Sequence, residues 1–256
     1  MPRIARKISN TKVYHIILRG NDKQDIFFDE QDYIKFIKEL IKVKEKYQCE
    51  YYAYCLMSNH VHMVIYDKQN MISKIIQSIA IAYSSYFSKK YEKVGHLFQN
   101  RFLSKNIESR EYLLEVVRYI HQNPLKAKIT NTDKYRWSSY QEYIRKEIII
   151  NPKQVLSIFG NTKQHSIENF IYFHKYINEG INDEIEYEII DKLADNEVKE
   201  KIEKLLQIND AREIRTYNTK IRNEKLKQLQ EIKGTTKVQL SRVLGINKRM
   251  LERVMK

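Results

Sequence analysis

The sequence predicts an α+β chain whose first half mixes strands and helices and whose second half is almost entirely helical. Three observations predict this. In the first 125 residues, stretches with the alternating apolar pattern of strands are followed by stretches with the 3.6-residue period of helices. Beyond Trp137 the helical period dominates. The 256 residues contain only three prolines, which excludes a long proline-rich linker.

The first four elements form a β-α-β-β series. Residues 13–18 are β-branched or aromatic for the most part, and a turn signal follows them at once. Residues 30–47 carry apolar side chains at a helical period, with lysines between them. Strands are predicted over residues 50–57 and 60–66. The short polar link between these two strands predicts a hairpin.

Three further elements complete the series. Residues 71–91 are predicted to be helical, and residues 97–107 to form a strand. Ser109 can cap the next helix, which is predicted to end at Asn123 because Pro124 disfavours the α conformation in the residue before it. The order β-α-β-β-α-β is that of the split-βαβ, ferredoxin-like fold, an antiparallel sheet with two helices on one face.

Composition indicates a soluble, basic protein of the cytoplasm. The chain has 46 Lys and Arg against 32 Asp and Glu, a net charge of +14, and a pI of about 9.5. No stretch is long and apolar enough for a membrane helix or a signal peptide. Cys49 and Cys55 are too few for a disulfide framework and lack the partners of a zinc site, so we expect them to be small packing residues.

The charge alternates along the chain. The net charge is +10 over residues 1–150, −5 over residues 151–210 and +9 over residues 211–256. Positive surfaces attract polyanions, and nucleic acid is the commonest polyanion of the cytoplasm. A general bias of the composition towards lysine could account for part of the total charge, but it does not explain the alternation. We expect three regions: a domain over 1–145, a partly acidic helical connector over 146–210, and a basic helical region over 211–256.

Two pairs of polar residues have a spacing that could serve chemistry. His60 and His62 lie two apart in a predicted strand, so both imidazoles point to one face and could converge on one divalent cation. Tyr119 and Asn123 lie one helical turn apart on one face. Each pair alone is better explained by ordinary packing, solvation or helix capping. The remaining histidines have no spacing that pairs them: His15, His96, His121, His165 and His174.

Four motifs occur in a fixed order and spacing. They cover residues 58–62, 95–102, 119–124 and 137–140, and include His60-Val61-His62 and the Tyr119 to Pro124 segment. Together they resemble the single-tyrosine HUH transposases of the IS200-like superfamily, and within it the branch of REP-associated tyrosine transposases. The resemblance covers roughly residues 8–145.

The resemblance implies a function and a site. His60 and His62 match the pair that binds Mg²⁺ or Mn²⁺, Tyr119 matches the nucleophile, and Asn123 matches a polar residue near the metal. Such enzymes cleave single-stranded DNA, often beside a hairpin, leaving a 5′-phosphotyrosine link and a free 3′-hydroxyl, and they rejoin strands by the reverse attack. The sequence has no glycine-rich phosphate loop, consistent with chemistry that uses no nucleotide cofactor. Ligand chemistry alone leaves zinc open.

Other residues are candidates for contacts with DNA. Arg101, Lys105 and Arg118 could hold the backbone. Three tyrosines of strand 50–57 could stack on unpaired bases, or be ordinary strand residues: Tyr51, Tyr52 and Tyr54. Near the C-terminus, two short helices around Gly245 resemble a helix-turn-helix, with a basic hairpin that packs on the rest of the chain as the alternative. The residues it would present to a DNA groove are Asn247, Lys248, Arg249 and Arg253.

Several alternatives stay open at this point. The same core chemistry serves replication-initiator nickases and conjugative relaxases. A DNA-binding regulator with an inactive core is the alternative from another class. The sequence does not decide between a monomer and a homodimer, and a monomer requires Tyr119 to reach the His60–His62 pair of its own chain.

Overall fold

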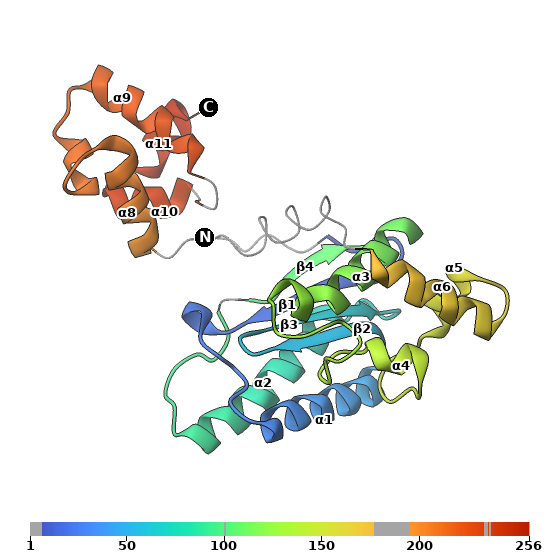
Figure 1. Cartoon of the computed structure of the whole chain (residues 1–256). Helices are drawn as coiled ribbons and strands as arrows, with labels where there is room; N and C mark the ends of the chain where they lie inside the picture. The colour runs from blue at the N-terminus through green and yellow to red at the C-terminus, as the bar shows by residue number, and fades with distance from the viewer. Residues whose placement is uncertain (1–6, 100, 177–194, 233–234, 236, 256) are drawn as a thin grey trace. The chain divides into compact units, whose positions relative to one another are not determined.

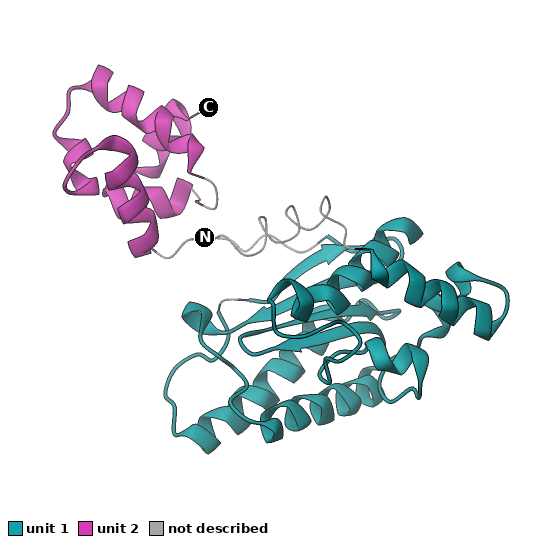
Figure 2. Ribbon diagram, in the orientation of Figure 1, with its two compact units in different colours: residues 1–178 teal, residues 179–256 magenta. Residues whose placement is uncertain are grey.

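The computed structural model describes residues 7–99, 101–176, 195–232, 235 and 237–255 (Figure 1). The chain divides into two compact units, residues 1–178 and residues 179–256 (Figure 2), and each is described by itself. Within the described parts of the chain, no helix is both long and apolar enough to span a bilayer.

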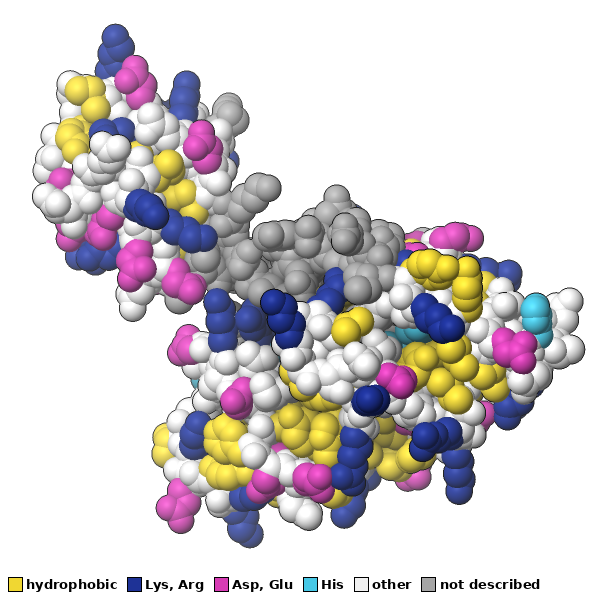
Figure 3. Space-filling model, viewed as in Figure 1, with side chains coloured by type: hydrophobic (Ala, Val, Ile, Leu, Met, Phe, Trp, Pro, Cys, Tyr) yellow, Lys and Arg dark blue, Asp and Glu magenta, His cyan; other side chains and the backbone are white. Residues whose placement is uncertain are grey.

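Charged side chains are spread over the surface. On the face seen in Figure 3, Lys and Arg occur on both units, with Asp and Glu between them. The net charge of +14 is therefore not confined to one patch of this face. The distribution of charge on this face therefore does not by itself locate a DNA-binding site.

The first unit is built on a four-stranded antiparallel sheet. Its strands are β1 (Val13–Arg19), β2 (Glu50–Met57), β3 (His60–Tyr66) and β4 (Leu103–Asn106). Their order in the sheet is β2-β3-β1-β4, and every neighbouring pair is antiparallel. This is the strand order of the split-βαβ arrangement, so the predicted ferredoxin-like fold is confirmed.

Helices cover both faces of this sheet. α1 (Glu30–Tyr47) and α2 (Ile72–Tyr91) pack together on one face, as predicted, and α3 (Arg110–Lys126) lies on the other (Figure 1). Alternation along β3 separates the two faces. Val61, Met63 and Ile65 are fully buried, and they point away from the face on which His62 meets α3.

The helices of this unit begin at residues with good capping groups. The side chains and backbone N–H groups of Asp29 and Asp32 form a capping box at the start of α1. Ser109 caps α3 as predicted, because its hydroxyl accepts a hydrogen bond from the Tyr112 backbone N–H at 3.1 Å. A short 3-10 helix, η1 (Asn21–Lys23), connects β1 towards α1.

The predicted strand 97–107 is shorter in the structure. Of the described residues in this stretch, Leu103–Asn106 form the strand that pairs with β1, opposite Tyr14–Ile17. The residues before β4 still follow the end of β1 through separate bonds. The Gln99 N–H donates to the Arg19 carbonyl at 2.8 Å, and the Asn21 N–H donates to the Leu97 carbonyl at 2.8 Å.

The predicted end of α3 at Asn123 is wrong, because the helix continues through Pro124 to Lys126. A proline so close to a C-terminus removes only one late hydrogen bond. The carbonyls of Asn123 and Pro124 accept from the N–H groups of Ala127 and Ile129, each at 2.9 Å. Both Asn123 and Pro124 are buried, so packing offsets the lost bond.

Three short helices close the face that α3 covers. They are α4 (Tyr140–Ile144), α5 (Lys153–Phe159) and α6 (Lys163–Lys175), and the last two contact α3. Glu142 of α4 is buried and accepts hydrogen bonds from the Tyr54 hydroxyl and from the backbone N–H groups of residues 148–150. Cys49 and Cys55 are buried free thiols, as expected for packing residues.

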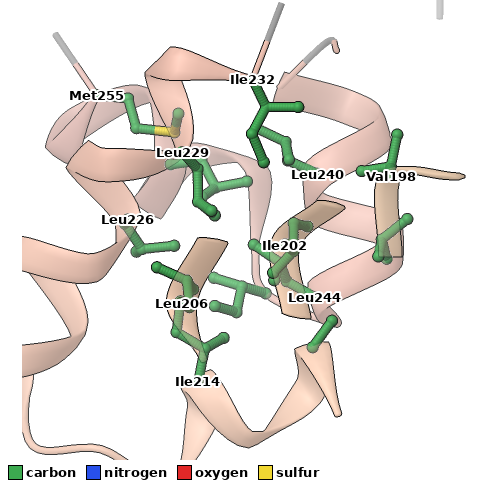
Figure 4. Packing of buried hydrophobic residues seen from close by; sticks show 14 residues of the cluster. Val198, Ile202, Leu206, Ile214, Leu226, Leu229, Ile232, Leu240, Leu244 and Met255 are labelled. Carbon is green, nitrogen blue, oxygen red and sulfur yellow. The ribbon is translucent and has the colours of Figure 1, made fainter. Parts of the chain in front are cut away.

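The second unit is helical. It contains α8 (Asp195–Leu206), η2 (Ala211–Arg215), α9 (Thr219–Gln228), η3 (Leu229–Glu231), α10 (Lys237–Leu244) and α11 (Lys248–Val254). Its core is aliphatic (Figure 4), and α8 contributes Val198, Ile202 and Leu206 to it. Part of the expected connector, residues 177–194, lies outside the described residues.

The described residues of the expected connector do not form a separate body. α5 and α6 belong to the first unit, and α8 belongs to the core of the second. The structure divides the chain into two units at residue 178, and the three regions expected from the charge pattern remain a prediction. An amphipathic helix such as α8 stabilises whichever core covers its apolar side, and charge does not reveal which core that is.

α10 and α11 follow one another as expected for the C-terminal pair of helices. Gly245 stands between them with a positive φ of 64°, and Asn247 caps α11 through the Arg249 N–H at 2.9 Å. The apolar residues of this pair pack into the core of the second unit: Leu240, Val243, Leu244, Ile246 and Leu251 are buried, and Val254 is partly buried. A helix-turn-helix remains a prediction for this pair.

Candidate active site

Strand β3 presents its two histidines to α3. His60 and His62 lie on the same face with ring centroids 4.9 Å apart and ring planes nearly perpendicular. His62 is fully buried and His60 is half-buried. The Nε2 atoms of both rings are buried without a hydrogen-bond partner among the described residues. Such atoms are expected where a ligand or ion completes a site.

α3 supplies the other two predicted residues. The ring of Tyr119 lies 5.4 Å from that of His62 and is 2% exposed. Asn123, one turn later, donates from Nδ2 to the Tyr119 carbonyl at 2.9 Å, which directs its amide oxygen elsewhere. Residues nearly 60 positions apart in sequence thus meet within one chain.

Burial keeps both histidines neutral. Burial, and then the positive charge of Arg19, lower the pKa of His60 to about 4, while the side chain of Asn123 opposes this shift. Burial holds the pKa of His62 well below its usual value, and nearby His60, His15 and Arg19 lower it further. Neutral imidazoles at pH 7 leave nitrogen lone pairs available to an electrophile or a metal ion.

The donor set fits a metal ion only in combination with an oxygen ligand. The described residues contain no cluster of three or more His, Cys, Asp or Glu side chains that could hold a metal. Two buried imidazole Nε2 atoms and the amide oxygen of Asn123 remain as donors. Such a mixed set suits several divalent ions and leaves coordination positions for ligands from outside the chain.

Comparison with known families identifies this part of the chain. Residues 8–123 match the family described as transposase IS200 like. Residues 8–123 belong to the IS200-like transposase family. The match assigns these residues of the first unit, and not the second unit, to a family of DNA-processing enzymes.

Two solved structures are similar to this chain. One is a REP-associated tyrosine transposase bound to a REP hairpin, with 17% identity, a TM-score of 0.49, and coverage of 56% of this chain and 86% of that chain. The other is a protein of Deinococcus radiodurans R1 assigned as a transposase, with 15% identity, a TM-score of 0.34, and coverage of 47% and 97%. No curated protein matches the chain significantly.

Sequence reasoning missed two residues that lie at the candidate site, both on β1. Arg19 lies opposite His60 in the β1–β3 register, and His15 contacts His62. The alternation of His15, Ile17 and Arg19 in a strand puts them on one face. Which strand lies beside β1 depends on topology, so this signal has no meaning before the sheet order is known. His15 was therefore set aside as a histidine without a partner.

The predicted contacts with DNA fall in different environments. Arg101 is exposed, and Lys105 lies on β4 opposite His15, close enough to lower the pKa of that histidine. Arg118 is only 7% exposed. Its guanidinium lies over the Phe173 ring at 4.0 Å and pairs with Glu115, so it holds α3 to α6.

The strand tyrosines that could have stacked on bases are buried in the structure. Tyr51, Tyr52 and Tyr54 are each at most 5% exposed. The hydroxyl of Tyr54 donates to Glu142, and Tyr52 stacks on Tyr66. These rings belong to the core and to its edge, because helices that follow β4 in sequence cover the strand.

The candidate residues of the second unit lie on or before α11. The side chain of Asn247 caps this helix by accepting a hydrogen bond from the Arg249 N–H. Lys248 forms an ion pair with Glu252 at 2.9 Å. Arg249 and Arg253 are exposed. These two arginines are the cations of α11 best placed to meet a polyanion.

Proposed function

We propose that the protein cleaves and rejoins single-stranded DNA through a 5′-phosphotyrosine intermediate on Tyr119. One observation carries the proposal: in a single chain, the Tyr119 ring lies 5.4 Å from His62, beside two buried imidazole nitrogens without partners. A tyrosine, two neutral histidines and an amide are the set that the family resemblance assigns to this reaction.

The proposed cleavage is a transesterification. The phenolic oxygen of Tyr119 attacks a backbone phosphorus, an O–P bond forms, and the bond from phosphorus to the 3′ oxygen breaks. The phenol loses one proton and the leaving 3′ oxygen gains one. A phosphodiester bond replaces a phosphodiester bond, so rejoining by another 3′-hydroxyl needs no nucleotide cofactor.

A phenol with a pKa near 10 is a weak nucleophile at neutral pH, so the phosphate has to be activated. We propose that His60, His62 and Asn123 hold a divalent cation, Mg²⁺ or Mn²⁺. Such an ion, when bound, polarises a phosphate and stabilises the charge that develops on it. The depressed pKa values of the two histidines support this role, because a protonated imidazole cannot ligate.

The proposed substrate is single-stranded DNA next to a hairpin. Arg19 lies close enough to both histidines to lower their pKa values, and we propose that it contacts the phosphate to be cleaved. Arg101 and Lys105 are proposed to follow the strand outwards, whereas Arg118 is engaged with Glu115 and Phe173. In the second unit, Arg249 and Arg253 are proposed to bind duplex DNA.

The experiment that tests the proposal is a covalent capture. End-labelled single-stranded hairpin oligonucleotides are incubated with the protein and Mg²⁺ or Mn²⁺, then run on a denaturing protein gel. The variants are Tyr119→Phe and the double variant His60→Ala/His62→Ala. Tyr112→Phe is the matched control, because it removes a hydroxyl two turns earlier on the same helix.

We expect a labelled, detergent-resistant adduct with the wild type and Tyr112→Phe, and none with the other two variants. Adduct without strand joining would favour a replication-initiator or relaxase-type nickase. DNA binding without adduct on any hairpin would favour a DNA-binding regulator with an inactive core. An adduct that survives Tyr119→Phe would contradict the assignment of the nucleophile.

A further inference from the structure

Each histidine of the candidate site is hydrogen-bonded through its Nδ1 atom. The Nδ1 of His60 lies 2.6 Å from the Oδ1 of Asn59. The Nδ1 of His62 lies 3.2 Å from the Nε2 of His15. In both rings the other nitrogen, Nε2, is buried and makes no hydrogen bond of ordinary geometry to the described residues. The side chain of Asn123 lies near enough to His60 to oppose the lowering of its pKa. The two rings thus share one arrangement, although their partners come from different elements.

The tautomer of His60 follows from the bonds of Asn59. The amide nitrogen of Asn59 donates to the Lys23 carbonyl at 3.3 Å, so its oxygen is the atom that faces His60. An amide oxygen only accepts hydrogen bonds, so the proton of the neutral His60 ring lies on Nδ1. The lone pair is then on Nε2, directed into the site.

The bond between His62 and His15 allows two tautomers. If Nδ1 of His62 donates to Nε2 of His15, the Nε2 of His62 keeps its lone pair. If Nε2 of His15 donates instead, the Nε2 of His62 carries a proton and cannot ligate. A cation at the site is compatible with the first arrangement only, in which His15 is the acceptor.

Both partners are held by the fold. Asn59 is part of the tight turn between β2 and β3, and its carbonyl accepts from the Gly20 N–H at 2.8 Å. His15 is 1% exposed in β1, next to β3 in the sheet. The backbones of both partners are thus fixed by the β2–β3 turn and by the β1–β3 pairing.

We propose that Asn59 and His15 are positioning residues that hold His60 and His62 with both Nε2 lone pairs directed at one cation. This inference rests on the proposed function, in which the two histidines bind a metal. Partners of this kind commonly change metal affinity by about 10- to 100-fold when they are removed.

Calorimetric titration of the full-length, DNA-free protein with Mn²⁺ tests the proposal. His15→Leu removes the acceptor at similar size, whereas His15→Gln returns an amide oxygen at about the reach of Nε2. We expect Mn²⁺ affinity to fall by about 10-fold or more in His15→Leu and to recover largely in His15→Gln. Asn59→Leu and Asn59→Asp form the equivalent pair for His60.

The matched control is another buried pair of histidines in the same unit. His121 Nδ1 and His174 Nε2 lie 3.0 Å apart, away from the candidate site. His174→Leu removes a buried histidine in the same way and is expected to lower stability while leaving Mn²⁺ affinity unchanged. Equal losses of affinity in His174→Leu and His15→Leu would mean that general loosening, rather than positioning, explains the effect.

Nitrogen NMR of ¹⁵N-labelled histidines gives a readout independent of cleavage. We expect the proton of His60 on Nδ1 with and without Mg²⁺, and that of His62 on Nδ1 when Mg²⁺ is bound. A proton on Nε2 of His60, or unchanged Mn²⁺ affinity in both leucine variants, would overturn the inference even if the wild type cleaves DNA. A wild type that binds Mn²⁺ and shows these tautomers but forms no adduct would overturn the proposed function alone.

Discussion

Single residues decide the polarity of the sheet face beneath α3. On β1 and β3, Arg19 lies opposite His60 in the register and Ile17 lies opposite His62. The positive charge of Arg19 lowers the pKa of both histidines. Burying a neutral imidazole costs far less than burying an imidazolium, which explains why both pKa values are lowered. Both histidines are therefore neutral at pH 7, and their nitrogen lone pairs are available to a ligand.

Gly20 gives a prediction at this scale. A β-carbon added there would lie 2.1 Å from the backbone oxygen of Gln24, and the Gly20 N–H also supports the turn that carries Asn59. We expect Gly20→Ala to lower the free energy of unfolding of the first unit by about 1–3 kcal/mol in urea titrations. Gly95→Ala is the control, since a β-carbon there meets nothing within 4 Å and only its positive φ is unfavourable. A larger loss for Gly95→Ala would contradict the steric explanation.

Among the elements, α3 is the one on which the site depends most. Its C-terminal half carries Tyr119 and Asn123. On another side of the helix, His121 bonds to His174 of α6 at 3.0 Å and to the Ser139 hydroxyl at 2.8 Å. These bonds join α3 to the segments that follow it in the sequence.

The buried contact between His121 of α3 and His174 of α6 should make the stability of the first unit depend on pH. Burial lowers the pKa of His174 to about 3, whereas the unfolded chain has a value near 6.5. Below pH 6.5 the unfolded state takes up a proton that the folded state refuses, so stability is full above pH 6.5 and falls as pH decreases towards 3. One such group contributes a slope of ~1.4 kcal/mol per pH unit.

His174→Gln keeps a group able to bond to His121. We expect it to reduce the slope of the unfolding free energy against pH by ~1.4 kcal/mol per pH unit, the contribution of one proton. Urea unfolding at several pH values between 6.5 and 4.5 measures it. His165→Gln is the control, because His165 is exposed on the same helix. An unchanged slope in His174→Gln would mean that His174 titrates alike in both states.

At the scale of the whole molecule, the first question is whether one chain is sufficient for cleavage. Tyr119 lies beside the histidines of its own chain, so a mixture of Tyr119→Phe with His60→Ala/His62→Ala should form no adduct with DNA. The adduct assay on the two variants, alone and mixed, makes the measurement. Adduct formed only in the mixture would show that a homodimer exchanges its tyrosine helices.

The second unit gives a further prediction. If Arg249 and Arg253 contact backbone phosphates, replacing both by alanine should weaken duplex binding and lower the salt dependence of log K by about 0.9 per lost contact. Adduct formation on short single strands should be unchanged. Arg242→Ala is the control, because Arg242 is also exposed but pairs with Asp195 at 2.5 and 2.6 Å. Equal salt dependence in all variants would contradict a role for α11.

The sequence by itself determined the local features of this protein. The apolar periods predicted β1, β2, β3, α1 and α2 nearly to the residue, and Ser109 predicted the start of α3, because these signals depend on neighbours along the chain. The family motifs indicated His60, His62, Tyr119 and Asn123.

Three features depend on contacts between distant segments and were found in the tertiary structure: the strand pairing at the candidate site, the end of α3, and the burial of several polar side chains. The pairing of β1 with β3 brings His15 and Arg19 to the histidines, and the packing around Pro124 allows α3 to continue. Arg118 and the tyrosines of β2 are buried because other elements of the fold cover them, although residue type suggested exposed positions. The physical reason is common to all of them: side-chain surroundings are set by segments that meet only after folding, and no spacing along the chain encodes them.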